Sequence, residues 1–263
     1  MVKEEKEKPR VRIGFILFWI IAASVMAFYG HIIFFPRSPF LPRSSSYEPF
    51  ERHYHLSTKF PFITSYFLML PEDYDPEQEE YPLVMMLHGV SRHMYAGSAL
   101  KHNKRRQKYR VIAYIPIAPP VFTWVNPFEE DIKPESLPVA MEILEGLKQE
   151  YSVDENKIYI TGYSMGGVGT YAALERYIDI FAAAAPVAGA WLPEKAYDLD
   201  DIPIWIFQGA KDPYAPLGRA VYSELKEFDR NVKFTDYPTR GHSAWSDTYD
   251  DNDFWDWLMT QER

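Results

Sequence analysis

The sequence of 263 residues contains no cysteine. This absence excludes disulfide bonds, thiol nucleophiles, cysteine-ligated zinc and iron–sulfur clusters. Basic residues are in the minority, with 28 Lys and Arg against 37 Asp and Glu and a formal net charge of −9. Because nucleic-acid binding requires a basic footprint, we expect no nucleic-acid partner. Hydrophobic residues make up 47% of the chain, which is typical of a globular protein and argues against general disorder.

Formal charge is missing from residues 13–35, which read IGFILFWIIAASVMAFYGHIIFF. At about 1.5 Å per residue, a helix of this length is about 35 Å long and can cross a hydrocarbon core of about 30 Å. We therefore expect a transmembrane signal anchor, with residues 1–12 as a cytoplasmic tail and the remaining chain outside the cytoplasm. Two interpretations compete with it. The first is cleavage as a signal peptide near residues 25–27 (VMA), which would give a secreted protein. The second is a buried core helix.

Residues 36–52 (PRSPFLPRSSSYEPFER) contain four Pro and four Ser. This composition is typical of an extended, surface-exposed linker. No second stretch of this kind interrupts the remaining sequence, so residues 53–263 are predicted to form one domain.

Short apolar runs alternate with helical patterns throughout this domain. The runs interpreted as strands are residues 65–70, 83–87, 111–118, 157–161, 181–188, 202–207 and 232–237, and the helices are residues 135–151, 166–177, 217–228 and 253–261. Such alternation predicts an α/β fold with a mostly parallel sheet and helices on both faces. In these sheets the chemistry lies at the carboxyl ends of the strands.

One short motif indicates a nucleophile. Gly162-Tyr163-Ser164-Met165-Gly166 follows a predicted strand and opens a predicted helix. A G-x-S-x-G sequence in that context predicts a nucleophile elbow, which exposes the serine hydroxyl above the sheet. The N-terminus of the helix then directs free N–H groups toward developing negative charge. Ser164 is therefore the candidate nucleophile.

A serine nucleophile needs a base, and the base needs an orienting carboxylate. His242 is the only histidine after Ser164, so it is the candidate base. Asp212 directly follows the buried run 202–207, where the chain order nucleophile, acid, base places the carboxylate. The alternatives, all after the histidine, are Asp247, Asp250 and Asp251.

Two backbone N–H groups are expected to stabilise the oxyanion. One belongs to Met165, the residue after the nucleophile. The other belongs to the loop after residues 83–87, where Val90 is the first candidate and Gly89 the second. His88 in the same loop is expected to brace it and not to transfer protons.

Taken together, the segments LHG, YITGYSMGGVGTYAAL, FAAAAPVAGA, IPIWIFQGAKDPYAPL and HSAW resemble the α/β-hydrolase superfamily. The pattern is most similar to compact serine esterases of the feruloyl esterase and polyhydroxybutyrate depolymerase type, and it is related to prolyl oligopeptidase catalytic domains. The resemblance covers about residues 60–263 and implies ester hydrolysis through Ser164, Asp212 and His242, with no metal and no organic cofactor. Residues 90–92 (VSR) depart from it, since many relatives continue with glycine there.

Three tryptophans are candidates for the rim of the cleft. Trp191, Trp245 and Trp124 each follow a predicted strand or the candidate base, where they could stack on an aromatic or sugar group. Ordinary packing is the alternative for each. The basic segment 101–110 could bind an anionic substrate or lipid headgroups, or form a solvated face.

The sequence favours a membrane-tethered serine carboxylesterase that acts on a small-molecule or polymer ester. A serine peptidase of the prolyl oligopeptidase type is the main alternative, although no propeller or acidic motif for a peptide N-terminus is evident. Two further alternatives are a secreted esterase and a non-catalytic binding protein. The complete set Ser164, Asp212 and His242 argues against the binding protein. The oligomeric state, the acyl group and the alcohol stay open.

Overall fold

The computed structural model describes residues 47–59, 63–127 and 133–263. The predicted tail, the predicted anchor and most of the predicted linker lie outside the described residues. No helix in the described ranges is long and apolar enough to span a membrane. One compact unit extends over Tyr47–Arg263. It begins before the expected boundary at residue 53, because Phe50 is buried and an edge strand starts at Glu51.

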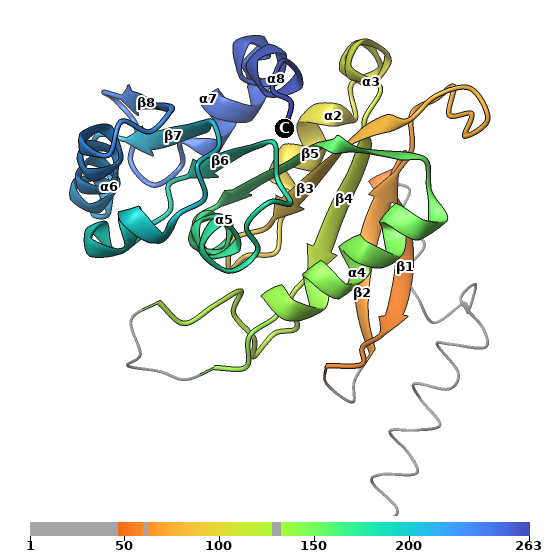
Figure 1. Cartoon of the computed structure of the whole chain (residues 1–263), viewed down its shortest axis with the longest axis horizontal. Coiled ribbons are helices and arrows are strands. Elements are labelled where there is room, and N and C mark those ends of the chain that lie inside the picture. Colours follow the sequence, from red (N-terminus) through yellow and green to blue (C-terminus); the bar gives the residue numbers. More distant parts are fainter. Residues whose placement is uncertain (1–46, 60–62, 128–132) are drawn as a thin grey trace, which may run out of the picture. The chain divides into compact units, whose positions relative to one another are not determined.

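An eight-stranded sheet runs through this unit in the order β1-β2-β4-β3-β5-β6-β7-β8 (Figure 1). Strands β1 and β2, and β2 and β4, pair antiparallel, and every other pair is parallel. The strands are β1 (Glu51–Leu56), β2 (Ile63–Met69), β3 (Tyr81–Leu87), β4 (Ile112–Ile117), β5 (Val153–Tyr163), β6 (Ala183–Val187), β7 (Ile204–Gly209) and β8 (Val232–Tyr237). The prediction of a mostly parallel sheet is confirmed. Only β1 was missed, because the half-exposed sequence ERHYHL has no apolar run.

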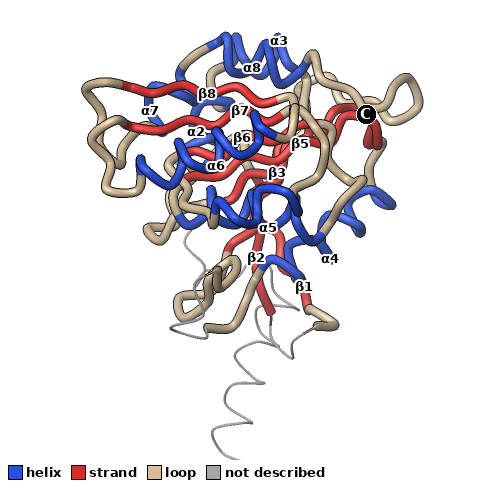
Figure 2. The backbone as a smooth tube through the Cα atoms, turned by 60° about the vertical axis from the view of Figure 1, so that its left-hand side comes forward, coloured by secondary structure: helices blue, strands red, loops and turns tan. Residues whose placement is uncertain are grey.

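Helices cover both faces of the sheet, as Figure 2 shows. One face packs against α4 (Leu137–Glu150), α5 (Met165–Arg176), α6 (Ala215–Glu227) and the 3-10 helix η2 (Pro193–Asp198). The other packs against α2 (Tyr95–Leu100), α3 (Asn103–Tyr109), α7 (Trp245–Asp250) and α8 (Asn252–Met259). The helices α2, α3, α7 and η2 were not among the predicted helices, since six or seven residues are too few to display a helical period.

The register of the central strands brings the candidate site together. Leu87 of β3 pairs with Gly162 of β5, and Gly162 pairs with Pro186 of β6. Further along the sheet, Gly209 of β7 pairs with Tyr237 of β8. The loops after β3, β5, β7 and β8 therefore leave the sheet at the same edge, where parallel strands present their carboxyl ends.

Candidate active site

The turn between β5 and α5 holds Ser164 in an unusual backbone conformation, with φ 57° and ψ −117°. A residue with a side chain rarely adopts such angles, and the surrounding structure must enforce them. Two glycines make the turn possible. A Cβ on Gly162 would overlap the carbonyl of Gly166, and a Cβ on Gly166 would overlap the carbonyl of Leu87. The chain can therefore reverse tightly between strand and helix, which leaves the serine side chain partly exposed above the sheet.

The three side chains predicted to act together lie in hydrogen-bonded order. Nε2 of His242 is 2.8 Å from Oγ of Ser164, and Nδ1 of His242 is 2.8 Å from Oδ2 of Asp212. The carboxylate is an acceptor only, so Nδ1–H donates to it and Nε2 accepts from the serine hydroxyl. The imidazole is 39% exposed and the Asp212 side chain 0%. This arrangement has the geometry of a serine nucleophile, its base and an orienting acid. Their catalytic role stays a prediction.

The three alternative aspartates have other partners. Asp247 pairs with Arg240, Asp250 pairs with Arg105, and Asp251 caps α8 by accepting from the N–H of Asp253. The structure therefore places only Asp212, among the four candidates, against the imidazole.

The buried carboxylate of Asp212 receives two further hydrogen bonds. Nε2 of Gln208 donates to Oδ2 over 3.0 Å, and the backbone N–H of Tyr214 donates to Oδ1 over 3.0 Å. The sequence reasoning missed Gln208. The only indication in the sequence was that this polar residue directly follows the apolar run IPIWIF.

The two predicted oxyanion donors lie at the start of α5 and in the loop after β3. Met165 is the first residue of α5, so its N–H has no intrahelical acceptor. Gly89 lies against the elbow, where a Cβ would sit 3.4 Å from Cβ of Ser164, and Val90 follows it with its side chain exposed. Within the described ranges, the N–H of Val90 donates no backbone hydrogen bond. Both residues thus belong to segments that meet at Ser164, and the function of their N–H groups stays a prediction.

Arg92 closes the loop that carries Val90. Its own N–H donates to the carbonyl of Gly89 over 3.0 Å, in a turn where Arg92 has φ 58°. Its guanidinium donates to the carbonyls of Val90, Ala118 and Pro119 over 3.1, 3.0 and 2.9 Å. A planar group with five donors suits this task. The guanidinium of Arg92 therefore holds the loop in place where many relatives have further glycines. Sequence reasoning had not assigned a role to Arg92.

His88 braces the same loop from beneath, as predicted. Its Nδ1 is 2.7 Å from the carbonyl of Gly89, and its Nε2 accepts from the N–H of Ala118 over 3.0 Å. Burial lowers the pKa of His88 to about 4, so the ring is neutral at neutral pH. The indole of Trp124 donates to the His88 carbonyl over 2.8 Å and is only 1% exposed. The expectation that Trp124 rims the cleft is therefore corrected: it packs beneath the loop.

The prediction that Trp191 lines the cleft also needs correction. Its side chain is 1% exposed and its ring stacks on Tyr171 with centroids 5.8 Å apart. The loop after β6 turns inward there, with Gly189 pressed against Gly167. The indole therefore belongs to the core and cannot contact a substrate in this structure.

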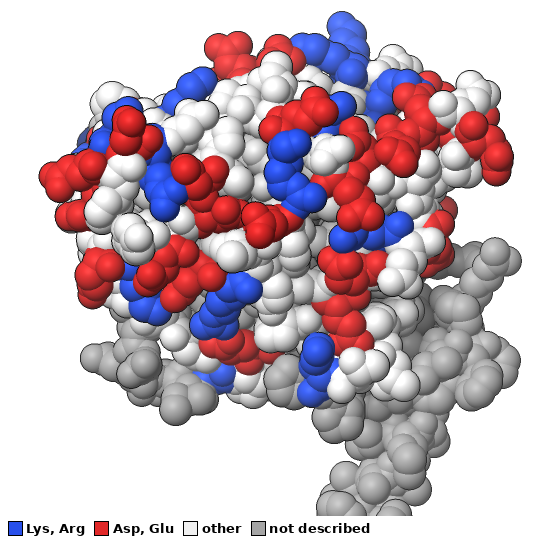
Figure 3. Space-filling model, in the orientation of Figure 1, with Lys and Arg blue, Asp and Glu red and all other residues white. Residues whose placement is uncertain are grey.

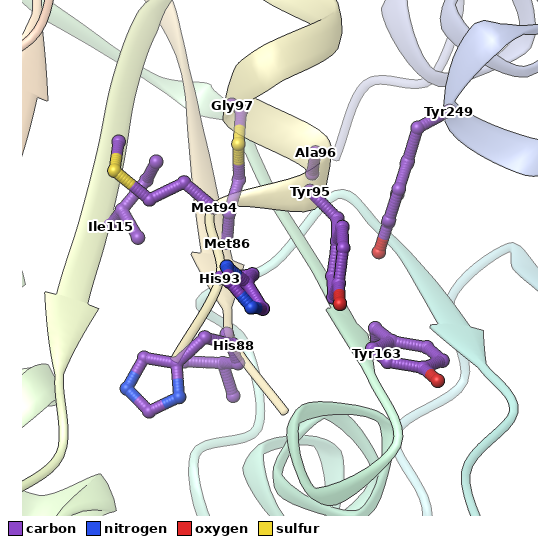
Figure 4. A pocket seen from close by; sticks show the side chains of 11 residues that line it. Met86, His88, His93, Met94, Tyr95, Ala96, Gly97, Ile115, Tyr163 and Tyr249 are labelled. Atoms are coloured by element: carbon purple, nitrogen blue, oxygen red, sulfur yellow. The ribbon is translucent and has the colours of Figure 1, made fainter. Parts of the chain in front are cut away.

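Trp245, in contrast, borders the site. It is half-buried and stacks on Tyr95 with a centroid distance of 3.9 Å, and it lies 6.5 Å from the ring of Tyr163. Figure 4 shows Tyr95 and Tyr163 side by side at a pocket that His93 also lines. Trp245 is thus the one predicted tryptophan near the candidate triad.

The basic segment 101–110 is largely neutralised. Its ion pairs are Arg105–Asp250, Arg106–Glu72, Lys108–Asp256 and Arg110–Glu79. Acidic and basic side chains also intermingle on the face drawn in Figure 3. These pairs tie α3 to the C-terminal helices and to the loop before β3, so the structure gives this segment a packing role. In the described part of the chain, no group of three or more His, Asp or Glu side chains is arranged to hold a metal ion.

Comparison with known proteins supports the same superfamily. A model described as the prolyl oligopeptidase family matches residues 123–208, which include Ser164 and end before Asp212 and His242. A bifunctional acetylxylan esterase/xylanase of Neocallimastix patriciarum is 28% identical over 92 residues, or 35% of this chain and 13% of that protein. A poly(3-hydroxyalkanoate) depolymerase of Paucimonas lemoignei is 29% identical over 117 residues, or 41% of this chain and 28% of that protein. The chain thus spans a minor part of these curated relatives.

Solved structures extend the likeness over most of the domain. A thermostable esterase superposes with a TM-score of 0.72 and 29% identity, covering 81% of this chain and 63% of that one. An S-formylglutathione hydrolase from Staphylococcus aureus (TM-score 0.65, 15% identity) covers 80% and 98% of the two chains, and a ferulic acid esterase (0.60, 16%) covers 78% and 93%. The predicted α/β-hydrolase fold and the resemblance to its serine esterases are confirmed.

Proposed function

We propose that this chain is a serine hydrolase that cleaves carboxylic esters through an acyl-enzyme intermediate. The observation that carries the proposal is the hydrogen-bonded series Ser164, His242, Asp212 on a strained elbow. The relatives support the ester as the bond, since one is named as an acetylxylan esterase, one as a polyester depolymerase and one as a thermostable esterase.

Acylation follows from the geometry. Oγ of Ser164 attacks the carbonyl carbon of the ester, and Nε2 of His242 takes the hydroxyl proton. Asp212 holds the imidazole in the required tautomer and stabilises its positive form. The N–H groups of Met165 and Val90 stabilise the negative oxygen of the tetrahedral intermediate. The intermediate collapses when His242 returns the proton to the alcohol oxygen, which leaves while the acyl group stays on the serine.

Deacylation repeats the sequence with water as the nucleophile. His242 takes a proton from the attacking water, and a second tetrahedral intermediate forms on the acyl carbon. Its collapse breaks the bond to Oγ of Ser164, which regains the proton from His242. The products are a carboxylic acid and the free enzyme.

The surroundings of His242 favour an alcohol with a ring. The departing oxygen must lie within hydrogen-bonding distance of Nε2, so the alcohol lies among the groups around the imidazole. The rings of Tyr163 and Tyr214 have centroids 5.3 and 6.0 Å from it, and Trp245 lies beyond Tyr163. Partly exposed aromatic faces stack well on flat or ring-shaped groups. We propose that small or polymeric esters with an aromatic or sugar alcohol bind there.

We also propose that the chain is tethered to a membrane. The proposal rests on the uncharged residues 13–35, with residues 1–12 in the cytoplasm and the hydrolase domain outside it. Removal of the segment would instead give a secreted esterase. N-terminal sequencing of membrane-extracted protein distinguishes the two, since an intact N-terminus supports the anchor. Protection of the domain from external protease in intact cells would contradict the orientation.

Ser164→Ala tests the proposed hydrolase. We expect kcat toward p-nitrophenyl acetate to fall on the order of 10⁶-fold, because both steps pass through the serine. A fluorophosphonate should label Ser164 of the full-length chain and leave the variant unlabelled. Unchanged turnover in the variant, or labelling elsewhere, would sink the assignment. A matched panel of peptide amides provides the control for a peptidase, which the family match over residues 123–208 makes the second candidate.

A further inference from the structure

Gln208 is a polar residue buried in the sheet next to the candidate triad. It is the last residue but one of β7 and is 0% exposed. Its Nε2 donates to Oδ2 of Asp212 over 3.0 Å, whereas its Oε1 has no hydrogen-bond partner among the described residues. A buried amide with an unpaired carbonyl lowers the stability of a fold. Packing alone therefore does not explain a glutamine at this position.

The orientation of the amide follows from the charge of its neighbour. A carboxylate only accepts hydrogen bonds, so the NH₂ group of Gln208 must face Asp212. The flipped amide would set its oxygen against Oδ2 of the carboxylate and lose the bond. The unpaired Oε1 is thus the consequence of directing the donor to Asp212.

The Asp212 carboxylate accepts three hydrogen bonds through its two oxygens. Oδ1 accepts from the N–H of Tyr214, and Oδ2 accepts from both Gln208 and Nδ1 of His242. The donors from Gln208 and Tyr214 hold the plane of the carboxylate against rotation about Cβ–Cγ. A lone pair of Oδ2 therefore stays directed at the imidazole.

The Gln208 side chain packs against α6, and its strand end packs against a neighbouring loop. Gly218 of α6 approaches it so closely that a Cβ there would lie 3.2 Å from Oε1 of Gln208. Gly209, the next residue, is pressed against the carbonyl of Gly241, directly before the candidate base. The strand end that carries Gln208 is therefore in contact with the loop that carries His242.

We infer that Gln208 is a positioning residue, which fixes the Asp212 carboxylate and through it the ring of His242. This inference rests on the proposed function. The glutamine does not touch the reacting atoms, so its removal should slow the chemical step and leave substrate binding unchanged.

Gln208→Met tests the inference in the full-length chain, because methionine keeps most of the volume and removes the donor. With p-nitrophenyl acetate we expect kcat to fall on the order of 10-fold, as a slightly misplaced catalytic group would cause, with KM within about twofold. Gln261→Met makes the same change in a residue that bonds Trp257 and Thr260, and should alter neither quantity.

A readout that does not depend on turnover completes the test. In Ser164→Ala protein, the Nδ1 proton of His242 should give a downfield NMR signal, which Gln208→Met weakens or shifts and Gln261→Met leaves in place. A wild type without esterase activity overturns the proposed function, and the NMR signal still decides the positioning. An active wild type with an equally active Gln208→Met variant and an unmoved signal overturns the inference alone. If Gln208→Met does not fold, Gln208→Leu, which fills less space, is held to the same expectations.

Discussion

The two walls that meet at Ser164 are built in different ways. The elbow, residues 162–166, depends on missing side chains, because Gly162 and Gly166 pack against backbone atoms with no room for a Cβ. The predicted oxyanion loop, residues 88–92, is held by side chains, because His88 and Arg92 hydrogen-bond to its carbonyls and to those of the loop that follows β4. The elbow contains Met165 and the loop contains Val90, the two residues whose N–H groups are the predicted oxyanion donors.

This difference decides how each wall responds to substitution. A Cβ that overlaps backbone atoms cannot be accommodated by a small adjustment, because moving the backbone of a buried sheet costs much free energy. Hydrogen bonds from a side chain can be lost one at a time, and the loop can remain folded while its geometry loosens. Substitution of the elbow glycines should therefore act on folding, and loss of the Arg92 hydrogen bonds should act on rate.

The largest effect is expected from Gly166→Ala, which breaks the elbow. Its Cβ would overlap the carbonyl of Leu87, so we expect the free energy of unfolding to fall by about 3 kcal/mol or more. Gly146→Ala is the matched control, since a Cβ there meets nothing within 4 Å in the middle of α4 and should stabilise by up to about 1 kcal/mol. Urea unfolding of both variants measures the contrast. Equal stability of the two would refute the steric account.

Arg92→Met should act on rate and not on folding. The variant loses the three guanidinium hydrogen bonds that hold the loop of Val90, so we expect kcat to fall by about 10-fold or more. Arg92→Lys keeps the charge without the planar fork and should lose nearly as much. Steady-state kinetics decide the matter. If the lysine variant retained full activity, charge and not geometry would be the contribution of Arg92.

His88 makes the oxyanion loop sensitive to acid. Because burial lowers the pKa of His88 to about 4 in the folded state, below the ordinary value of about 6.5, the unfolded chain binds the proton first. The linkage of His88 contributes about 3 kcal/mol to the free energy of unfolding. This contribution is complete above pH 6.5 and declines as the pH falls toward 4. Urea unfolding between pH 7 and pH 4 measures the decline, which His88→Gln should flatten. An identical slope in the variant would assign the acid sensitivity to other groups.

The smallest effect should come from Trp245→Ala, because Trp245 belongs to neither wall. Loss of its ring leaves Tyr95 without a stacking partner beside the proposed alcohol site. For an ester with an aromatic or sugar alcohol we expect KM to rise by about threefold, since one exposed stacking contact contributes about 0.5–1.5 kcal/mol. The KM of the methyl ester of the same acid should stay constant. A rise for both esters would place the effect outside the alcohol site.

Much of the fold was predictable because buried parallel strands are apolar throughout. The runs around Leu83 and Ile204 were recognisable for that reason, and the glycines around Ser164 marked the elbow by their spacing. Strand β1 and helix α2 were missed, since an edge strand and a one-turn helix have no such pattern. Among the tryptophans, the sequence could not separate Trp191 from Trp245, because burial depends on which way a loop turns after its strand.

By itself the sequence determined the α/β alternation, the elbow and the identities of Ser164, Asp212 and His242 as the group brought together. These follow from local chemistry: glycine spacing, apolar runs and a single histidine after the nucleophile. Only the tertiary structure decided that Gln208 faces Asp212 and that Arg92 closes the loop of Val90. Such contacts join positions whose neighbours are set by strand register and loop path, and a linear pattern of polar and apolar residues contains neither.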